Sequence, residues 1–189
     1  MKRTLVAIAI SLFATSIASA DPLPVAPIAS VKPISPGPAS VPTFRGPTPV
    51  LLCTDPAATS IDFSIASRSS RYKGRARITG TVKNVGTAPY VSGPNQQLAE
   101  LWEVPVGGRP RLVAQRAFQN LEPGAEVTVT FERDWYSASP AEGEFPPTYR
   151  LMVAYDPDIR IDGNVKNDDC NSANNVRERS GADINGLFR

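Results

Sequence analysis

The sequence predicts an all-β protein, and within that class a β-sandwich of about seven antiparallel strands. Two observations lead to this fold class. Short runs in which apolar and polar residues alternate recur through the second part of the chain, and this period of two is typical of half-buried strands. Residues that favour turns, chiefly glycine, proline and asparagine, separate the runs at near-regular intervals.

Residues 1–20 have the features of a signal peptide. Lys2 and Arg3 supply positive charge, residues 5–17 form a short apolar run, and Ala18-Ser19-Ala20 offers small residues for cleavage. Cleavage would leave a mature chain that begins at Asp21. No later run approaches the ~20 apolar residues that cross a bilayer, so we expect no membrane span in the mature chain.

Residues 21–50 differ sharply in composition from the rest of the mature chain. They hold nine of the nineteen prolines, among alanine, serine and valine, and no apolar face repeats. Such a segment cannot bury enough surface to offset its ordering entropy. We therefore expect a disordered, proline-rich tether in front of a folded domain over residues 51–180.

The first two strands of the domain are predicted from alternation. We place them over residues 61–65 and 75–83, because apolar side chains alternate with polar ones in both. Gly74 is expected to turn the chain between them. Gly86 comes after the second strand, and we expect it to adopt a left-handed backbone conformation.

The strand over residues 98–104 is apolar on both faces, so its phase stays open. In one phase Trp102 is the buried aromatic residue of a central strand. In the other, Ala99 and Leu101 face inward and Trp102 covers an edge. Alternation alone does not choose between the two.

The remaining strands are predicted over residues 112–118, 127–131 and 149–155, the last as a central strand. Asp156-Pro157-Asp158 ends that strand, because proline cannot donate a hydrogen bond to a ladder. A long polar loop then leads to a final strand over residues 174–178. Residues 181–189 are expected to form a C-terminal tail.

Charge and cysteine content narrow the function classes. Without the predicted leader, eighteen basic residues face eighteen acidic ones, which argues against nucleic-acid binding by long-range attraction. Cys53 and Cys170 lie in a chain bound for an oxidising compartment, so we expect them to form a disulfide. The absence of histidine removes the usual base of serine and cysteine hydrolases and the commonest zinc ligand.

Three strings carry a family resemblance: Gly80-Thr81-Val82-Lys83-Asn84-Val85-Gly86-Thr87-Ala88, residues 121–131 (LEPGAEVTVTF), and residues 149–158 with the later pair Asn174-Asn175. Their order and spacing over roughly residues 59–180 resemble the CARDB module, the cell-adhesion-related domain found in bacteria. The resemblance implies an immunoglobulin-like sandwich that binds or spaces other molecules outside the cytoplasm. The family has no shared catalytic residues, so none are transferred.

The loop after the central strand carries many oxygen ligands of the kind that calcium prefers. Its spacing departs from the calcium-loop template, because Ile161 stands where the turn needs glycine and Asn167 where a bidentate glutamate belongs. We therefore favour a solvated loop over a metal site, and whether residues 156–169 bind calcium stays open. The residues concerned are Asp156, Asp158, Asp162, Asn164, Asn167, Asp168 and Asp169.

Several surface residues are candidates for partner contacts. Arg75 and Arg77 share the outward face of the second strand, where they could bind an anionic glycan or simply discourage edge pairing. Tyr149 fits the structural tyrosine corner of sandwich domains. The aromatic residues best suited to contact a partner are Tyr90, Trp102, Trp135 and Tyr136, although for the two tryptophans a core position is favoured.

These observations lead to one function hypothesis and one alternative. The hypothesis is a secreted, non-enzymatic binding module that recognises a protein or a glycan in the bacterial periplasm or at the cell surface, without a cofactor. The alternative is a structural spacer or accessory subunit that docks onto an envelope or secreted protein complex. The sequence leaves the identity of the partner and the oligomeric state open.

Overall fold

The computed structural model describes residues 52–189, which are mostly antiparallel strands with few helical turns, so the all-β prediction is confirmed for this part of the chain. The predicted signal peptide and tether lie outside the described residues. The elements are β1 (Pro56–Arg68), β2 (Lys73–Asn84), β3 (Tyr90–Val91), β4 (Gln97–Val104), β5 (Arg111–Ala117), β6 (Asn120–Leu121), β7 (Glu126–Tyr136), η1 (Pro140–Glu144), β8 (Thr148–Tyr155), η2 (Ser172–Asn174), β9 (Val176–Ser180) and α1 (Ala182–Leu187).

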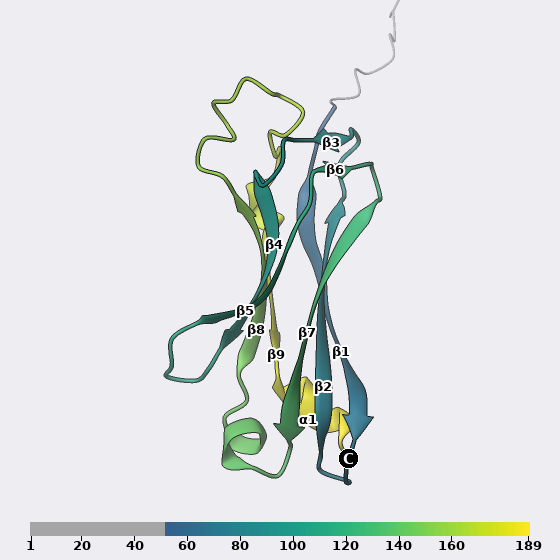
Figure 1. Cartoon of the computed structure of the whole chain (residues 1–189), viewed down its shortest axis with the longest axis vertical. Coiled ribbons are helices and arrows are strands. Elements are labelled where there is room, and N and C mark those ends of the chain that lie inside the picture. Colours follow the sequence, from purple (N-terminus) through teal and green to yellow (C-terminus); the bar gives the residue numbers. More distant parts are fainter. Residues whose placement is uncertain (1–51) are drawn as a thin grey trace, which may run out of the picture. The chain divides into compact units, whose positions relative to one another are not determined.

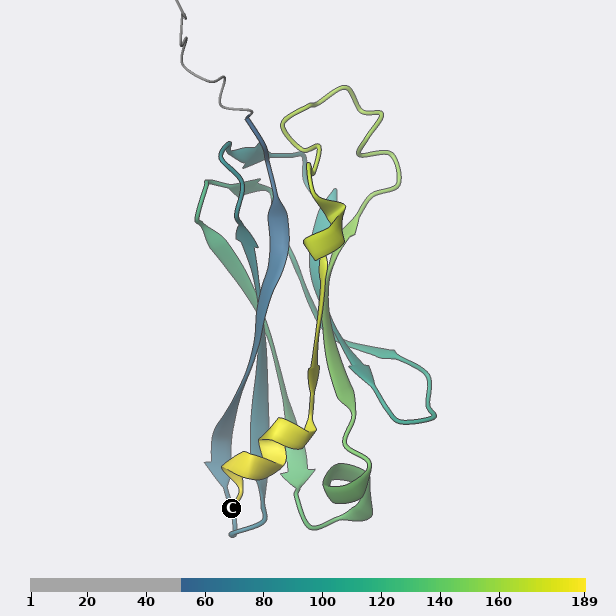
Figure 2. The same ribbon diagram turned by 180° about the vertical axis from the view of Figure 1, so that it is seen from behind.

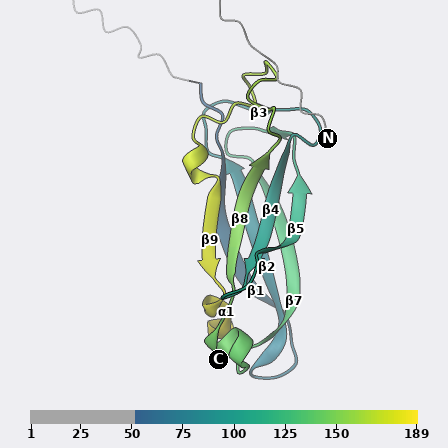
Figure 3. The ribbon, with the colours of Figure 1, turned by 90° about the vertical axis from the view of Figure 1, so that its left-hand side faces the viewer.

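The strands form two main sheets that lie face to face (Figure 1). One sheet has the order β1-β2-β7 and the other β5-β4-β8-β9, and neighbouring strands in both are antiparallel. Figure 3 looks onto the larger sheet, with β9 and β5 at its edges. The short strands β3 and β6 pair with each other at the end where the described chain begins (Figure 1).

One hydrophobic core fills the space between the sheets. Ile78 of β2, Leu101 of β4 and Leu151 of β8 are fully buried in it, as the alternation in their strands predicts. Gly80 has a packing role, because a Cβ atom there would lie 2.7 Å from Leu151 Cδ1. The glycine therefore lets β8 pack closely against β2.

The structure chooses between the two phases of β4. Ala99 and Leu101 are fully buried, whereas Trp102 lies on the opposite face and is partly exposed. The indole Nε1 of Trp102 donates a hydrogen bond to Glu100 Oε2 on its own strand, at 2.9 Å. The second phase is therefore correct, and it also turns Glu103 inward.

Two of the predicted turns differ from the structure. Gly74 does not turn the chain but lies inside β2, and the turn falls at residues 69–72. Gly86 does not have the positive φ that we expected. It is required instead by a close approach, since a Cβ atom would lie 2.1 Å from the backbone oxygen of Cys53. Gly124, at φ 80°, does hold the left-handed position in the turn before β7.

The last residues are not the tail that we predicted. After β9 the chain forms α1, and both Ile184 and Phe188 are fully buried in the core. Figure 2 shows α1 beside the ends of β1 and β2, on the same end as the helical turn η1. We call this the helix end. The folded domain therefore extends beyond residue 180, because two large apolar side chains close the core there.

A disulfide closes the opposite end. Cys53 and Cys170 are bonded, with their Cα atoms 5.8 Å apart, and Thr54 pairs with Asp169 in an isolated parallel bridge beside them. On the chain-entropy model, closing a loop of this length stabilises the fold by about 4–5 kcal/mol. We call this the disulfide end.

The disulfide bond indicates an oxidising, extracytoplasmic environment. Among the described residues, none of the helices is long and apolar enough to cross a membrane.

Candidate binding site

Two of the aromatic residues that we proposed as surface contacts are buried. Tyr90 is fully buried, and Trp135 is 1% exposed. The Tyr90 hydroxyl donates to Gln97 Oε1, and Trp135 Nε1 donates to Asn185 Oδ1 near the helix end. Both prefer the core because a partner for their one polar group is available inside the domain. Neither can touch a partner protein or glycan.

The other predicted contact residues do not converge on one site. Arg75 and Arg77 lie on the outer face of the three-stranded sheet, where both form ion pairs with Glu132 at 3.7 and 2.7 Å. Tyr136 ends β7 on that sheet, and Lys73 lies over its ring. Trp102 lies on the outer face of the other sheet. The positive charge of the arginine pair is thus partly cancelled, which weakens it as an anion site.

A hollow of about 770 Å³ lies at the disulfide end. Four parts of the chain line it: residues 52–54, the stretch after β2 with Ala88, Pro89 and Val91, Glu122 in the turn before β7, and the loop that leads to Cys170. Aliphatic side chains and the disulfide supply most of its wall, and among them Leu52 is 80% exposed and Val165 77% exposed. The apolar wall residues are Leu52, Ala88, Pro89, Val91 and Val165.

Asn84 holds two of these segments in place. Its side chain is fully buried, and its Oδ1 accepts hydrogen bonds from the backbone nitrogens of Asp55 and Gly86. Its Nδ2 donates to the backbone oxygens of Ala88 and Leu121, at 2.9 and 2.8 Å. All four hydrogen-bonding positions of this amide are filled, so the loop after β2 is fixed against the entry of the chain. This loop forms one wall of the hollow.

The rim of the hollow is acidic. Glu122, Asp168 and Asp169 border it, against one positive side chain, Lys166. Burial raises the pKa of Tyr90 behind the hollow, and the nearby charge of Asp169 raises it further. The hollow therefore offers a partner apolar area surrounded by negative charge.

The acidic loop is more ordered than a merely solvated loop. Asp162 accepts hydrogen bonds from Gln96 Nε2, Asn164 N and Asn167 Nδ2. The bond from Asn167, and after it that from Asn164, holds the pKa of Asp162 below its ordinary value. Cys53, Asp55 and Cys170 also place their ligand atoms within 4.8 Å of one another. Because the two sulfurs are bonded to each other, they do not act as thiolate ligands.

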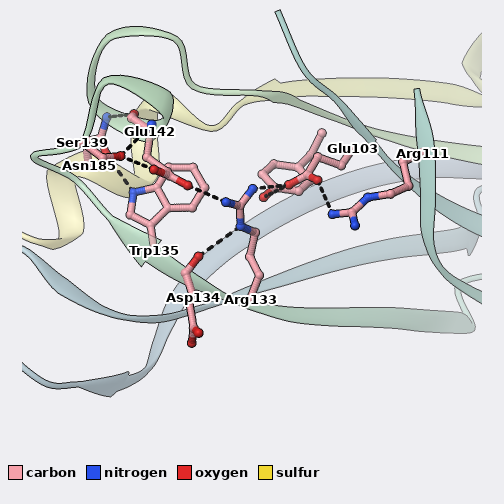
Figure 4. A network of polar contacts seen from close by, with 9 residues as sticks. Glu103, Arg111, Arg133, Asp134, Trp135, Ser139, Glu142 and Asn185 are labelled. Atoms are coloured by element: carbon pink, nitrogen blue, oxygen red, sulfur yellow. Dashed lines mark hydrogen bonds and ion pairs between the residues drawn. The ribbon is translucent and has the colours of Figure 1, made fainter. Parts of the chain in front are cut away.

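A second polar cluster lies at the helix end (Figure 4). Glu103 is only 4% exposed, and its carboxylate accepts hydrogen bonds from Arg111, Arg133 and the Tyr149 hydroxyl. Arg133 also pairs with Glu142, whose backbone oxygen accepts from Asn185 Nδ2. Tyr149 thus bonds a side chain of β4, whereas the tyrosine corner that we expected bonds the backbone upstream.

The electrostatics of this cluster fit a structural role. Burial favours a raised pKa for Glu103, but hydrogen bonds from Arg111 and Arg133, with the charge of Arg133, outweigh it and lower the pKa. Burial likewise opposes the charge of Arg133, yet Glu103 raises its pKa. A carboxylate held ionised in this way is poorly suited to proton transfer near neutral pH. We therefore assign the cluster to holding β4, β7, η1 and α1 together.

Sequence reasoning missed the hollow at the disulfide end. Val91 and Val165 lie outside the segments in which apolar and polar residues alternate, so the sequence pattern assigns neither of them to a core or to a surface. One signal was present: the predicted disulfide brings Cys53 and its neighbour Leu52 to the loop that holds Ile161 and Val165. Apolar residues in an otherwise polar loop, next to that clasp, point to a shared surface.

Comparison with known proteins adds no family to this picture. No family model matches the chain, and no curated protein matches it. Two solved structures show a weak likeness: Se-Met labelled β-glucosidase from Kluyveromyces marxianus, at 14% identity and a TM-score of 0.27, and β-glucosidase from the same organism in complex with glucose, at 18% and 0.26. Each alignment covers 65% of this chain and spans 14% of the other. A likeness this low carries no conclusion about fold or function.

Proposed function

We propose that this protein is a non-enzymatic binding module of the bacterial periplasm or cell surface, and that the hollow at the disulfide end receives an apolar segment of a partner protein. The domain would be an immunoglobulin-like sandwich of the CARDB type, carried out of the cytoplasm by its signal peptide. The single observation that carries the proposal is the hollow itself, which is lined by the exposed side chains of Leu52, Val91 and Val165. Exposed apolar patches on a domain of this size are typical of interaction sites.

The chemistry of the hollow favours a protein over a glycan. Sugar rings commonly stack on exposed aromatic faces, and the hollow is lined by aliphatic side chains, with Tyr90 buried behind it. The acidic rim also disfavours anionic glycans and anionic lipid headgroups. A peptide with aliphatic residues flanked by lysine or arginine matches both the wall and the rim.

The experiment uses the chain from Asp21 onward, immobilised and panned against a random peptide library. We expect the selected peptides to combine aliphatic residues with lysine or arginine. Val165→Lys should weaken their binding about tenfold or more, because it removes apolar area and places a positive charge on the acidic rim. Lys166→Gln should strengthen their binding, because it removes the positive charge that borders the hollow.

Val106→Lys is the matched control. Val106 is 66% exposed in the β4–β5 turn and lies outside the hollow, so this change should leave peptide affinity unaltered. Melting temperatures show that the variants stay folded. Equal losses for Val165→Lys and Val106→Lys would contradict the proposal, as would selection of a glycan ligand whose binding depends on Arg75 and Arg77.

A further inference from the structure

We propose that Asp169, Asn167 and Asn175 form a calcium site beside the disulfide. Asn167 is 1% exposed and Asn175 7% exposed, and the Oδ1 atom of each is buried without a hydrogen-bond partner. Leaving a buried acceptor unsatisfied costs about 1–3 kcal/mol. Each of these two oxygens therefore calls for a ligand.

The identity of these oxygens is fixed by their amide partners. Asn167 Nδ2 donates to Asp162 Oδ2 at 2.7 Å, and Asn175 Nδ2 donates to Asp169 Oδ2 at 2.6 Å. Flipping either amide would place its oxygen against a carboxylate oxygen. Both side chains therefore present oxygen, the ligand atom of hard cations, to their surroundings.

Asp169 joins the two asparagines. It shares with Asn167 the lining of a void of about 10 Å³, which also touches Tyr155, Ile159 and Arg160. A void of this size has room for one water molecule or one monatomic ion. Asn175 is bonded directly to the Asp169 carboxylate. Asn167 thus shares a void with Asp169, and Asn175 contacts the Asp169 carboxylate directly.

No ion pair of the protein neutralises the carboxylates of Asp169 and Asp55 in the described part of the chain. Within the described part of the chain, no lysine or arginine nitrogen lies within 4.0 Å of the Asp169 or Asp55 carboxylates. Asp55, although 7% exposed, accepts from Asn174 Nδ2, and Asn174 Oδ1 is a third buried oxygen without a partner. Buried carboxylates are costly without a positive partner. A cation at Asp169 would supply one.

The ligand set suits calcium better than other ions. A carboxylate offers roughly four acceptor positions. The carboxylate of Asp169 accepts three hydrogen bonds, from Tyr155, Asn171 and Asn175, so one position remains for a cation. Carboxylate and amide oxygens with water in an irregular arrangement are typical of calcium, whereas magnesium demands an octahedron and zinc prefers nitrogen and sulfur. The site draws on Asn175, which lies beyond the loop that fails the template.

Terbium is a suitable probe, because it replaces calcium and is excited through nearby tyrosines. The Tyr155 hydroxyl lies 3.1 Å from Asp169 Oδ2. We expect the chain from Asp21 onward to give tyrosine-sensitised terbium emission that saturates at one ion per chain and is displaced by calcium, but not by equal magnesium. Calcium should also raise the melting temperature relative to a chelator.

Two variants and a control decide the assignment. Asp169→Asn should weaken terbium affinity about tenfold or more, because it removes the ligand charge. Arg160→Gln, an exposed change that spares the fold, should strengthen it several-fold by removing the positive charge on the void. Asp158→Asn, an exposed aspartate of the same loop, should have no effect.

Absence of saturable emission, or displacement by calcium and magnesium alike, would overturn the proposal and leave an ordered water as the occupant. Equal losses for Asp169→Asn and Asp158→Asn would show diffuse binding to an acidic loop and would also overturn it. Peptide binding plays no part in these measurements, so this site and the proposed function stand or fall separately.

Discussion

Glu103 is a buried, ionised side chain, so its contribution to stability depends on the polar groups that face it. Glu103→Gln keeps the shape but removes the charge that Arg133 and Arg111 contact. We expect the free energy of unfolding to fall by about 2–3 kcal/mol. The control is Glu132→Gln, whose exposed ion pairs with Arg75 and Arg77 should contribute less than about 1 kcal/mol. Urea denaturation at neutral pH measures both.

The pH dependence of Glu103 has a definite sign. Its folded-state pKa is lowered, so the stability it contributes is present above the unfolded pKa, about 4.3, and is lost as pH falls through the folded value. Unfolding free energies of wild type and Glu103→Gln should therefore converge only in acid, below about pH 4. Convergence already near neutral pH would contradict the ion-paired arrangement.

The inward position of Glu103 follows from one of the two phases that the sequence left open for its strand, whereas the hollow was not predicted. Once Ala99 and Leu101 are placed inward, the period of two also places Glu103 inward. The sequence could not choose that phase, because Trp102 offers as much apolar surface as its neighbours. The hollow depends on residues such as Val91 and Val165, whose proximity arises from tertiary structure alone.

At the scale of elements, α1 closes the core at the helix end. Phe188 is fully buried, and Arg68 lies over its ring at 5.3 Å. We expect Phe188→Ala to lower the free energy of unfolding by about 3–5 kcal/mol, the range for a large buried aromatic residue. Leu187→Ala is the neighbouring control, and because Leu187 is 37% exposed its effect should be much smaller. If Phe188→Ala and Leu187→Ala had equally small effects in urea denaturation, residues 181–189 would have to be a tail that does not pack on the core.

Strands were easier to predict than this helix for a physical reason. A strand of eight residues, such as β8, repeats its apolar face four times, and the pattern stands out. The helix α1 has six residues and buries one of them, Ile184. The next buried side chain, Phe188, is the C-cap of the helix, so the spacing of about one turn occurs only once. The spacing was present but too short to distinguish from chance.

At the scale of the whole domain, the two ends differ in the contacts that hold them together and in the surface that they expose. The helix end is tied by the Glu103 cluster and α1, which join both sheets through buried contacts. The disulfide end combines the clasp, exposed aliphatic residues and an acidic loop. The antiparallel strands and the clasp were predicted from the sequence pattern, whereas the strand order of each sheet was not. The different make-up of the two ends became visible only in the structure.

The most direct test of the proposed binding site at the disulfide end is a hydrogen-exchange footprint of a selected peptide on the chain from Asp21 onward. We expect slower amide exchange at residues 52–54, 88–91 and 165–170 when the peptide is bound, with no change at the helix end. Protection confined to residues 73–77 and 132–136, the outer face that carries Arg75 and Arg77, would contradict it.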